Sequence, residues 1–252
     1  MKRQGMKSTL VNSVLPRLLG ASDYVSFARI SATLRAAGAE FSTNTLRRYL
    51  SEATSSGLIF DAGRAWYSRL SSAFVLDTKP IAPLLRSVKR DFPLLDISVW
   101  STGQINPHAH HLLSIHTAFL FAEADALPSV AEKLEDRGWK AFANPGSHEA
   151  QRRFRPGDKT VVLRPSLSKQ PEGDNGAAPV EKLLVDLLAE AARLRLMDES
   201  EAQTVIANVA QAGRIQVAAL LGYARRRGME IAYFNESTNS SCRDKLDLMD
   251  QE

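Results

Sequence analysis

The chain has 252 residues, of which 44% are hydrophobic and 24% charged, a composition typical of a folded protein rather than a disordered one. No apolar run approaches the roughly 18–20 residues of a membrane span, and no apolar stretch long enough for a signal peptide follows the basic start. The single cysteine, Cys242, excludes an internal disulfide and a cysteine-clustered zinc site, so we expect a cytoplasmic protein without membrane contact.

The net charge of +4 is unevenly distributed along the chain. Residues 1–95 hold 14 Lys and Arg against 6 Asp and Glu, a net charge of +8, whereas residues 96–252 hold 18 against 22, a net charge of −4. This asymmetry predicts two modules, of which only the first is suited to bind a polyanion. We expect a DNA-binding domain at 1–72, a connecting helix within 73–94, a second domain at 95–234 and a polar tail at 235–252.

The first module is predicted to contain three helices and a hairpin. Apolar residues at helical spacing predict helices at 9–19, from the Ser26 cap to Gly38, and at 43–55 after the Ser42 cap. Two strand-like runs around a glycine-containing turn, 58–60 and 64–67, predict the hairpin. This order is typical of a winged helix-turn-helix, in which 43–55 would be the recognition helix.

One face of the predicted recognition helix is polar, basic and poor in acid. Leu46 and Leu50 point toward the core, and on the rest of the helix Glu52 is the one acidic residue. Arginine pairs with guanine, asparagine with adenine, and serine and threonine bind phosphates, while an arginine at the hairpin tip can act from the wing. The residues that we predict to contact DNA are Thr43, Asn44, Thr45, Arg47, Arg48, Ser51 and Arg64. The alternatives are an ordinary solvated face or a protein-binding module.

The second module is predicted to be a small α/β domain followed by a C-terminal helical bundle, which makes the whole chain α+β or α/β. Strands separated by helices imply some parallel pairing. The expected strands are 95–100, 117–122, 139–143 and 159–163, and the expected helices are 81–91, 107–113, 128–137, 179–196, 199–211 and 215–227, with a loop at 165–178.

Three groups of residues are candidates for chemical sites. The histidines His108, His110 and His111, with His116 nearby, lack an acidic or cysteine partner at helical spacing, so partly exposed histidines are favoured over a metal site. The carboxylates Asp96, Glu123 and Asp125 lack the lysine that a restriction-nuclease-like site would place two residues further on. The basic loop 152–155 suits nucleic acid, an acidic partner or solvent. We therefore expect no enzyme activity, no cofactor and no metal.

The order of the modules, and four short segments, resemble the antitoxin of the abortive-infection E type, from type IV toxin–antitoxin systems. The segments are 96–100, the apolar strand ending in Glu123, 179–187 (PVEKLLVDL) and 223–228 (YARRRG). The resemblance implies that the winged helix binds inverted repeats in the operon promoter and represses transcription. It also implies that the second domain, of nuclease-like but non-catalytic fold, counteracts a nucleotidyltransferase-like toxin without a stable complex. The resemblance extends to individual site residues only on the polar face of the third helix and in the wing.

The function expected from the sequence is therefore an antitoxin-like transcriptional autorepressor that binds double-stranded DNA. A palindromic operator would favour two copies of the chain on the DNA. Three alternatives stay open: a ligand-responsive regulator, a metal-dependent DNA nuclease using Asp96, Glu123 and Asp125, and an interaction adaptor.

Overall fold

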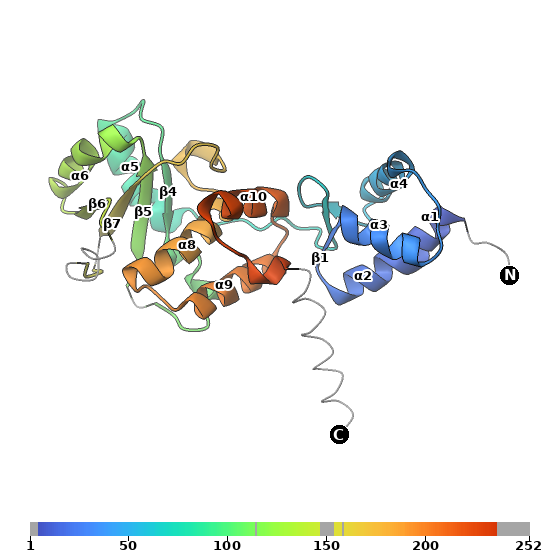
Figure 1. Ribbon diagram of the computed structural model, residues 1–252. Coiled ribbons are helices and arrows are strands. Elements are labelled where there is room, and N and C mark those ends of the chain that lie inside the picture. The colour runs from blue at the N-terminus through green and yellow to red at the C-terminus, as the bar shows by residue number, and fades with distance from the viewer. Residues whose placement is uncertain (1–4, 114, 147–153, 158, 236–252) are drawn as a thin grey trace, which may run out of the picture. The chain divides into compact units, whose positions relative to one another are not determined.

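Among the residues that the structure describes, helices make up 52% and strands 14%, and the strands form two small sheets, which gives an α+β fold. The computed structural model describes residues 5–113, 115–146, 154–157 and 159–235 (Figure 1). The described chain divides into two compact units, the first formed by residues 5–74, 210–221 and 232–235 and the second by residues 75–209 and 222–231. Arg152, Arg153 and all but the first residue of the expected polar tail lie outside the described residues.

The first unit combines helices with a three-stranded antiparallel sheet of order β1-β3-β2. Its elements are α1 (Met6–Thr9), π-helical η1 (Leu10–Val14), α2 (Leu15–Ala21), β1 (Tyr24–Ser26), α3 (Phe27–Ala36), α4 (Thr43–Ser55), β2 (Phe60–Asp61), β3 (Trp66–Ser68) and the 3₁₀ turn η7 (Ala232–Phe234). Fully buried leucines and isoleucines join the helices, among them Leu10, Ile30, Leu34, Leu46 and Leu50. The sequence does not predict the three-residue strand β1, because its pairing depends on residues about 40 positions further along the chain.

Tyr24 of β1 holds a C-terminal segment within the first unit. Its hydroxyl lies 3.0 Å from the carbonyl oxygens of Ala210 and Gly213, and the backbone N–H of Ile215 donates to it, also at 3.0 Å. The order of elements in the sequence assigns these residues to the second domain instead. The difference arises because the anchoring tyrosine is about 190 residues away from the segment that it holds.

The second unit is built on a four-stranded sheet of order β4-β5-β7-β6. β4 pairs antiparallel with β5, and β7 pairs parallel with both β5 and β6, so the expected parallel pairing is confirmed. The strands are β4 (Ser98–Ser101), β5 (Thr117–Ala122), β6 (Lys140–Ala143) and β7 (Thr160–Pro165). The 3₁₀ turns of this unit are η2 (Lys79–Ile81), η3 (Thr102–Gln104), η4 (Asn106–His108), η5 (Ala124–Ala126) and η6 (Asp174–Gly176).

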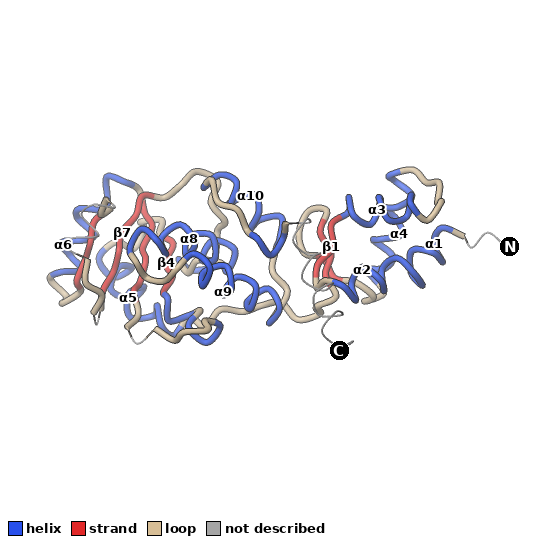
Figure 2. The backbone as a smooth tube through the Cα atoms, turned by 60° about the horizontal axis from the view of Figure 1, so that its bottom comes forward, coloured by secondary structure: helices blue, strands red, loops and turns tan. Residues whose placement is uncertain are grey.

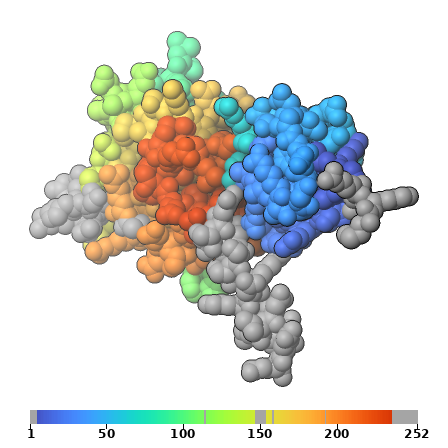
Figure 3. All heavy atoms as spheres, turned by 45° about the vertical axis from the view of Figure 1, so that its right-hand side comes forward, coloured from blue at the N-terminus to red at the C-terminus, as the bar shows by residue number. Residues whose placement is uncertain are grey.

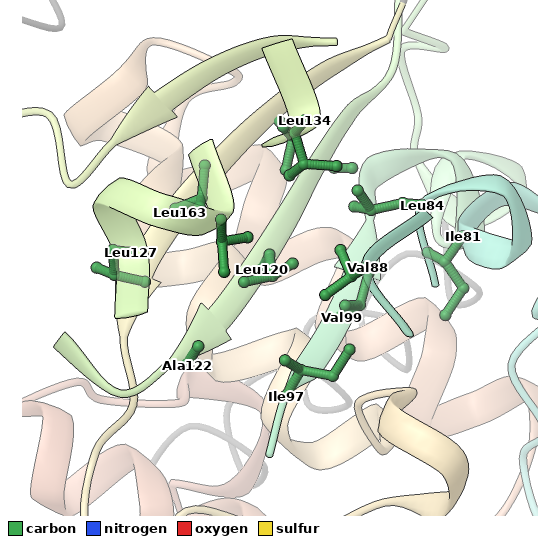
Figure 4. Close-up of a cluster of buried hydrophobic side chains, with 13 residues drawn as sticks. Ile81, Leu84, Val88, Ile97, Val99, Leu120, Ala122, Leu127, Leu134 and Leu163 are labelled. Atoms are coloured by element: carbon green, nitrogen blue, oxygen red, sulfur yellow. The ribbon is translucent and has the colours of Figure 1, made fainter. Parts of the chain in front are cut away.

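Helices cover both faces of this sheet (Figures 1 and 2). α5 (Ala82–Asp91) and α6 (Leu127–Glu135) pack Leu84, Val88 and Leu134 against one face, where Leu120 and Leu163 meet them (Figure 4). α5 is thus a layer of the second unit and not merely a connector. Because side chains alternate between faces along a strand, the residues next to these, Phe121 and Arg164 among them, point to the other side. α8 (Val180–Leu194) covers that side, and α9 (Glu199–Ala212) and α10 (Val217–Arg227) follow it.

The helix expected at 107–113 is wrong, because only one 3₁₀ turn, η4, forms there. Ala109 is extended, and the side chain of Asn106 closes the segment into a loop. Its Oδ1 accepts from the backbone N–H of Leu113 at 2.7 Å, while its Nδ2 donates to the Leu113 carbonyl at 3.2 Å. These bonds satisfy backbone groups that a helix would otherwise have satisfied. Across the described part of the chain, no helix is both long and apolar enough to cross a lipid bilayer.

Candidate functional site

Helix α4 presents one face to the core of the first unit and the other to solvent. The hydroxyl of Ser42 accepts a hydrogen bond from the backbone N–H of Thr45 at 3.1 Å, which caps the helix as the sequence predicts. Leu46, Leu50 and Ala53 are buried and fix the orientation of the helix about its axis. The face opposite these anchors is therefore held outward.

Most of the side chains predicted to contact DNA lie on the exposed surface of α4. Thr43, Asn44, Arg47, Arg48 and Ser51 are exposed. Thr45 is half-buried, and its hydroxyl lies 2.9 Å from that of Ser42, so it belongs to the cap of the helix. α3 and α4 lie at the surface of the unit (Figure 3, blue).

The two arginines of α4 rest on aromatic rings. The Arg47 guanidinium lies 5.8 Å from the centre of the Phe27 ring, and that of Arg48 lies 5.1 Å from the Tyr49 ring. Exposed cation–π contacts and ion pairs are worth about 1 kcal/mol or less. The rings therefore orient the guanidinium groups without preventing them from exchanging these contacts for phosphates or base edges.

The acidic residue on this face, Glu52, is paired with two cations. Its carboxylate lies 2.6 Å from the Lys7 ammonium and 3.8 Å from Arg48. The hydrogen bond from Lys7 and the nearby charges hold the pKa of Glu52 below its usual value. The negative charge that the sequence shows on this face is thus compensated by Lys7, which sequence reasoning missed because α1 lies far from α4 in the chain.

The β2–β3 turn carries Arg64, the residue predicted to act from the wing. Gly63 adopts a φ of 93°, and a Cβ added there would lie 3.0 Å from the Cβ of Ala218 on α10, so the turn rests closely on this part of the first unit. Arg64 and Ala65 are exposed beside this contact. A glycine is required at position 63 by both the backbone angle and the close approach.

A second group of functional candidates lies on α8, where three charged side chains are buried in a row. Lys182, Asp186 and Glu190 are spaced four residues apart, so they share one stripe of the helix, and none of the three is accessible to solvent. The Lys182 Nζ lies 2.6 Å from the Asp186 Oδ2. The ammonium also lies 3.4 Å from the centre of the Phe121 ring on β5. The contact of the Lys182 ammonium with Phe121 therefore joins α8 to the sheet.

The rest of this buried charge network comes from β7 and α10. Arg164 donates two hydrogen bonds to Glu190, from Nε at 3.1 Å and from a terminal nitrogen at 2.6 Å. The Tyr223 hydroxyl donates to Asp186 at 2.7 Å, and Arg227 lies 3.2 Å from the same carboxylate. Buried charges are tolerated only when paired and hydrogen-bonded in this way.

Burial is the largest influence on the pKa values of Asp186 and Lys182. It raises the pKa of the Asp186 carboxyl, an effect that Lys182 and Arg227 oppose, and it lowers the pKa of Lys182, which Asp186 opposes. Burial and the neighbouring Asp186 together raise the pKa of the Tyr223 hydroxyl well above its usual range. Because the network is enclosed, it is suited to fix α8 against the sheet and α10 rather than to meet a substrate. In the sequence, the feature that indicates this network is the four-residue spacing of the charged residues 182, 186 and 190 in a leucine-rich helix.

The second unit also contains a cavity of about 370 Å³. Thr102 and Thr117 line it together with apolar side chains, and the exposed Arg155 and Arg195 line it as well. The remaining lining residues are Leu113, Ile115, Phe154, Pro156, Leu194 and Leu196. Its size and mixed lining fit a small molecule.

The candidate metal ligands are arranged differently from the sequence expectation. Asp96, Glu123 and Asp125 are exposed and, within the described ranges, form no group of three donors close enough to share an ion. The three carboxylates therefore do not converge on one ion. His110 and His111 do come together, with Glu201 of α9 as a third donor that sequence reasoning did not include.

The sequence model of one protein family, described as a family of unknown function (DUF6577), matches residues 45–241. The matched segment begins within α4 and continues through the second unit. No curated protein matches the chain.

Proposed function

The chain belongs to this family of unknown function (DUF6577), and we propose that it is a cytoplasmic DNA-binding transcriptional autorepressor that acts as the antitoxin of a type IV toxin–antitoxin system. In this proposal the first unit is a winged helix-turn-helix, α4 is its recognition helix and the β2–β3 turn is its wing. The second unit counteracts a nucleotidyltransferase-like toxin.

The observation that carries the DNA-binding proposal is the composition of the exposed face of α4. Arg47 and Arg48 project from a helix whose other side is anchored in the core, and the one acidic group beside them, Glu52, is compensated by Lys7. Two ring-supported guanidinium groups, with Asn44 and hydroxyl groups around them, are the donors that read bases and hold phosphates in the major groove. The net charge of +8 in residues 1–95 favours the approach of DNA.

The antitoxin part of the proposal is supported by the resemblance of the two segments 179–187 and 223–228. These segments contribute Lys182, Asp186, Tyr223 and Arg227 to a single buried network. The similar residues therefore meet one another in the fold, which makes a chance likeness of two separate short helices a weaker explanation.

The test of DNA binding uses a fragment of the promoter upstream of the chain's own gene. Replacement of Arg47 and Arg48 by alanine is expected to cost about 1–3 kcal/mol of binding free energy for each arginine that pairs well with a base. The matched control replaces Arg86 and Arg90, two exposed arginines of α5, and removes the same charge from the second unit. Equal affinity of the two double variants in a gel shift would contradict the proposal.

The test of the antitoxin role is growth of cells that carry the neighbouring nucleotidyltransferase-like gene. Co-expression of the chain is expected to restore growth, and the Arg47→Ala, Arg48→Ala variant should still do so because the second unit is intact. A stable complex between the two proteins in a pull-down, or the lack of such a neighbouring gene, would contradict a type IV role.

A ligand-responsive regulator is the second candidate, favoured by the cavity in the second unit. Its lining suits a small molecule with apolar and acidic parts, because Arg155 and Arg195 lie beside threonines and leucines. A metabolite that raises the melting temperature of the protein and shifts its affinity for promoter DNA would favour this function. The response should weaken in an Arg195→Ala variant.

A further inference from the structure

The loop that follows η4 brings two neighbouring histidines against the first turn of α9. The Nδ1 of His110 lies 3.3 Å from the Nε2 of His111, and one ligand atom from each histidine and from Glu201 lie within 4.8 Å of one another. Both histidines are exposed and Glu201 is half-buried. We propose that His110, His111 and Glu201 form a binding site for a divalent transition metal ion, with Zn²⁺ as the ion that best fits the donors.

The separation of the two ring nitrogens matches a zinc coordination sphere. Zn–N bonds of about 2.0–2.1 Å at a tetrahedral angle place two nitrogen ligands about 3.3–3.4 Å apart. The two nitrogens thus already have the spacing of ligands to one ion. Because the imidazole rings are exposed, rotation of the side chains can bring all three donors onto the ion.

The carboxylate of Glu201 is held in place by the same loop. One of its oxygens, Oε1, accepts hydrogen bonds from the backbone N–H groups of His110 at 2.7 Å and His111 at 3.2 Å. Ligating carboxylates in metal sites are themselves hydrogen-bonded, and such bonds orient them toward the ion. The side chain of Asn208 on α9 adds a bond of 2.8 Å to the carbonyl of His108. The loop is therefore already attached to α9 before an ion binds.

The donor set indicates the chemical class of the ion. Two neutral imidazoles and one carboxylate suit Zn²⁺ and related first-row ions, whereas Mg²⁺ and Ca²⁺ prefer oxygen ligands. Three protein ligands leave a fourth position for water, which is the arrangement of an open zinc site. The ion would join the loop closed by Asn106 to α9, and its binding is separate from the proposed DNA contacts because all its ligands belong to the second unit.

The test is calorimetric titration of the untagged full-length chain with Zn²⁺, carried out on a Cys242→Ser background so that the thiol does not bind the ion. We expect one ion per chain and a higher melting temperature in its presence. His110→Ala and His111→Ala should each weaken binding by more than the roughly 10–100-fold typical of losing an outer-shell partner. His116→Ala is the matched control, since this exposed histidine lies five residues from His111 and outside the three donors.

The Glu201→Gln variant tests whether Glu201 binds the metal ion or only holds the loop. The amide oxygen still accepts hydrogen bonds from the two backbone N–H groups, so the loop should keep its fold, whereas affinity for Zn²⁺ should fall at least about 10-fold. Co²⁺ provides a second readout, because its visible absorption reports four-coordinate binding. Unchanged Zn²⁺ affinity in the His110→Ala, His111→Ala double variant, or no stoichiometric binding to the parent chain, would overturn the proposal and would show that the ring contact is only a hydrogen bond.

Discussion

Lys182 and Asp186 form an ion pair on α8 in which the two charged atoms are 2.6 Å apart and neither side chain is exposed. The pair is connected unequally to its surroundings. Asp186 also accepts from Tyr223 at 2.7 Å and faces Arg227 at 3.2 Å, whereas Lys182, apart from Asp186, has a longer 3.4 Å contact with the Tyr223 hydroxyl and the ring of Phe121. The carboxylate is thus the shared partner of three donors, and this asymmetry leads to the first prediction.

Removal of Asp186 should destabilise the chain more than removal of Lys182. Breaking a buried ion pair by removing one partner costs about 3–5 kcal/mol. Asp186→Leu removes the acceptor that Lys182, Tyr223 and Arg227 share, whereas Lys182→Met leaves Asp186 with Tyr223 and Arg227. The double variant should cost less than the sum of the two single variants, because it leaves no unpaired ammonium.

Urea unfolding followed by circular dichroism measures these differences in the free energy of unfolding. The control is Lys133→Met on α6, which breaks the exposed pair with Asp136 at the C-cap of that helix and should change stability little. Strict additivity of the two α8 substitutions would show that the pair is not energetically coupled.

The alkaline titration of Tyr223 provides the second prediction. Burial beside Asp186 raises the pKa of this hydroxyl in the folded state, so Tyr223 stays protonated when an unfolded tyrosine ionises near pH 10.0. A group with a raised folded-state pKa contributes stability below its unfolded pKa and loses it as the pH rises. Stability should therefore fall above about pH 10, and the fall should be shallower in Tyr223→Phe.

Phenolate absorbance follows the same event directly. Native protein should show delayed ionisation for Tyr223 and also for Tyr233, whose pKa is raised by burial and by Asp23. Ionisation of all five tyrosines of the native protein with an ordinary midpoint would contradict this prediction.

The sequence predicts well those parts of the fold whose stabilising contacts join residues close together along the chain. α4 begins after its Ser42 cap and buries Leu46 and Leu50, as the residues of that segment alone indicate. The buried charge network depends instead on Arg164, Tyr223 and Arg227, whose proximity to α8 is a property of the tertiary fold. Sequence spacing shows the charged stripe but not that partners enclose it.

The candidate metal site shows the same limit. Helical spacing offers His110 and His111 no partner, yet their third donor lies about 90 residues away and the segment is a loop. Only the closure of that loop by Asn106 and its attachment to α9 bring Glu201 to the histidines. A rule based on the spacing of nearby residues cannot predict such a distant partner.

Tyr24→Phe should loosen the C-terminal segment of the first unit. The substitution leaves the N–H of Ile215 and the carbonyls of Ala210 and Gly213 without this buried partner, and an unsatisfied buried group costs about 1–3 kcal/mol. Faster hydrogen exchange at the Ile215 amide and a lower free energy of unfolding are expected.

The matched control for Tyr24 is Tyr49→Phe in the same unit. The hydroxyl of Tyr49 has no hydrogen-bond partner among the described residues, so its loss should leave Ile215 exchange unchanged. Equal effects of the two substitutions would mean that the Tyr24 hydroxyl is not the anchor.

Lys7 should influence DNA binding through Glu52, without being one of the residues expected to read bases. In Lys7→Ala the pKa of Glu52 should rise toward its ordinary value, because its main hydrogen-bond donor is lost, and NMR titration of the carboxyl measures this. The depressed pKa means that this pairing stabilises the fold above the unfolded pKa and is lost as the pH falls. At neutral pH the uncompensated carboxylate would lie beside Arg48 and repel phosphates. Affinity for promoter DNA should therefore fall in Lys7→Ala, stay near the parent value in Lys7→Arg, and recover when Glu52→Gln is added to Lys7→Ala. Failure of Glu52→Gln to restore affinity would assign Lys7 a direct phosphate contact instead.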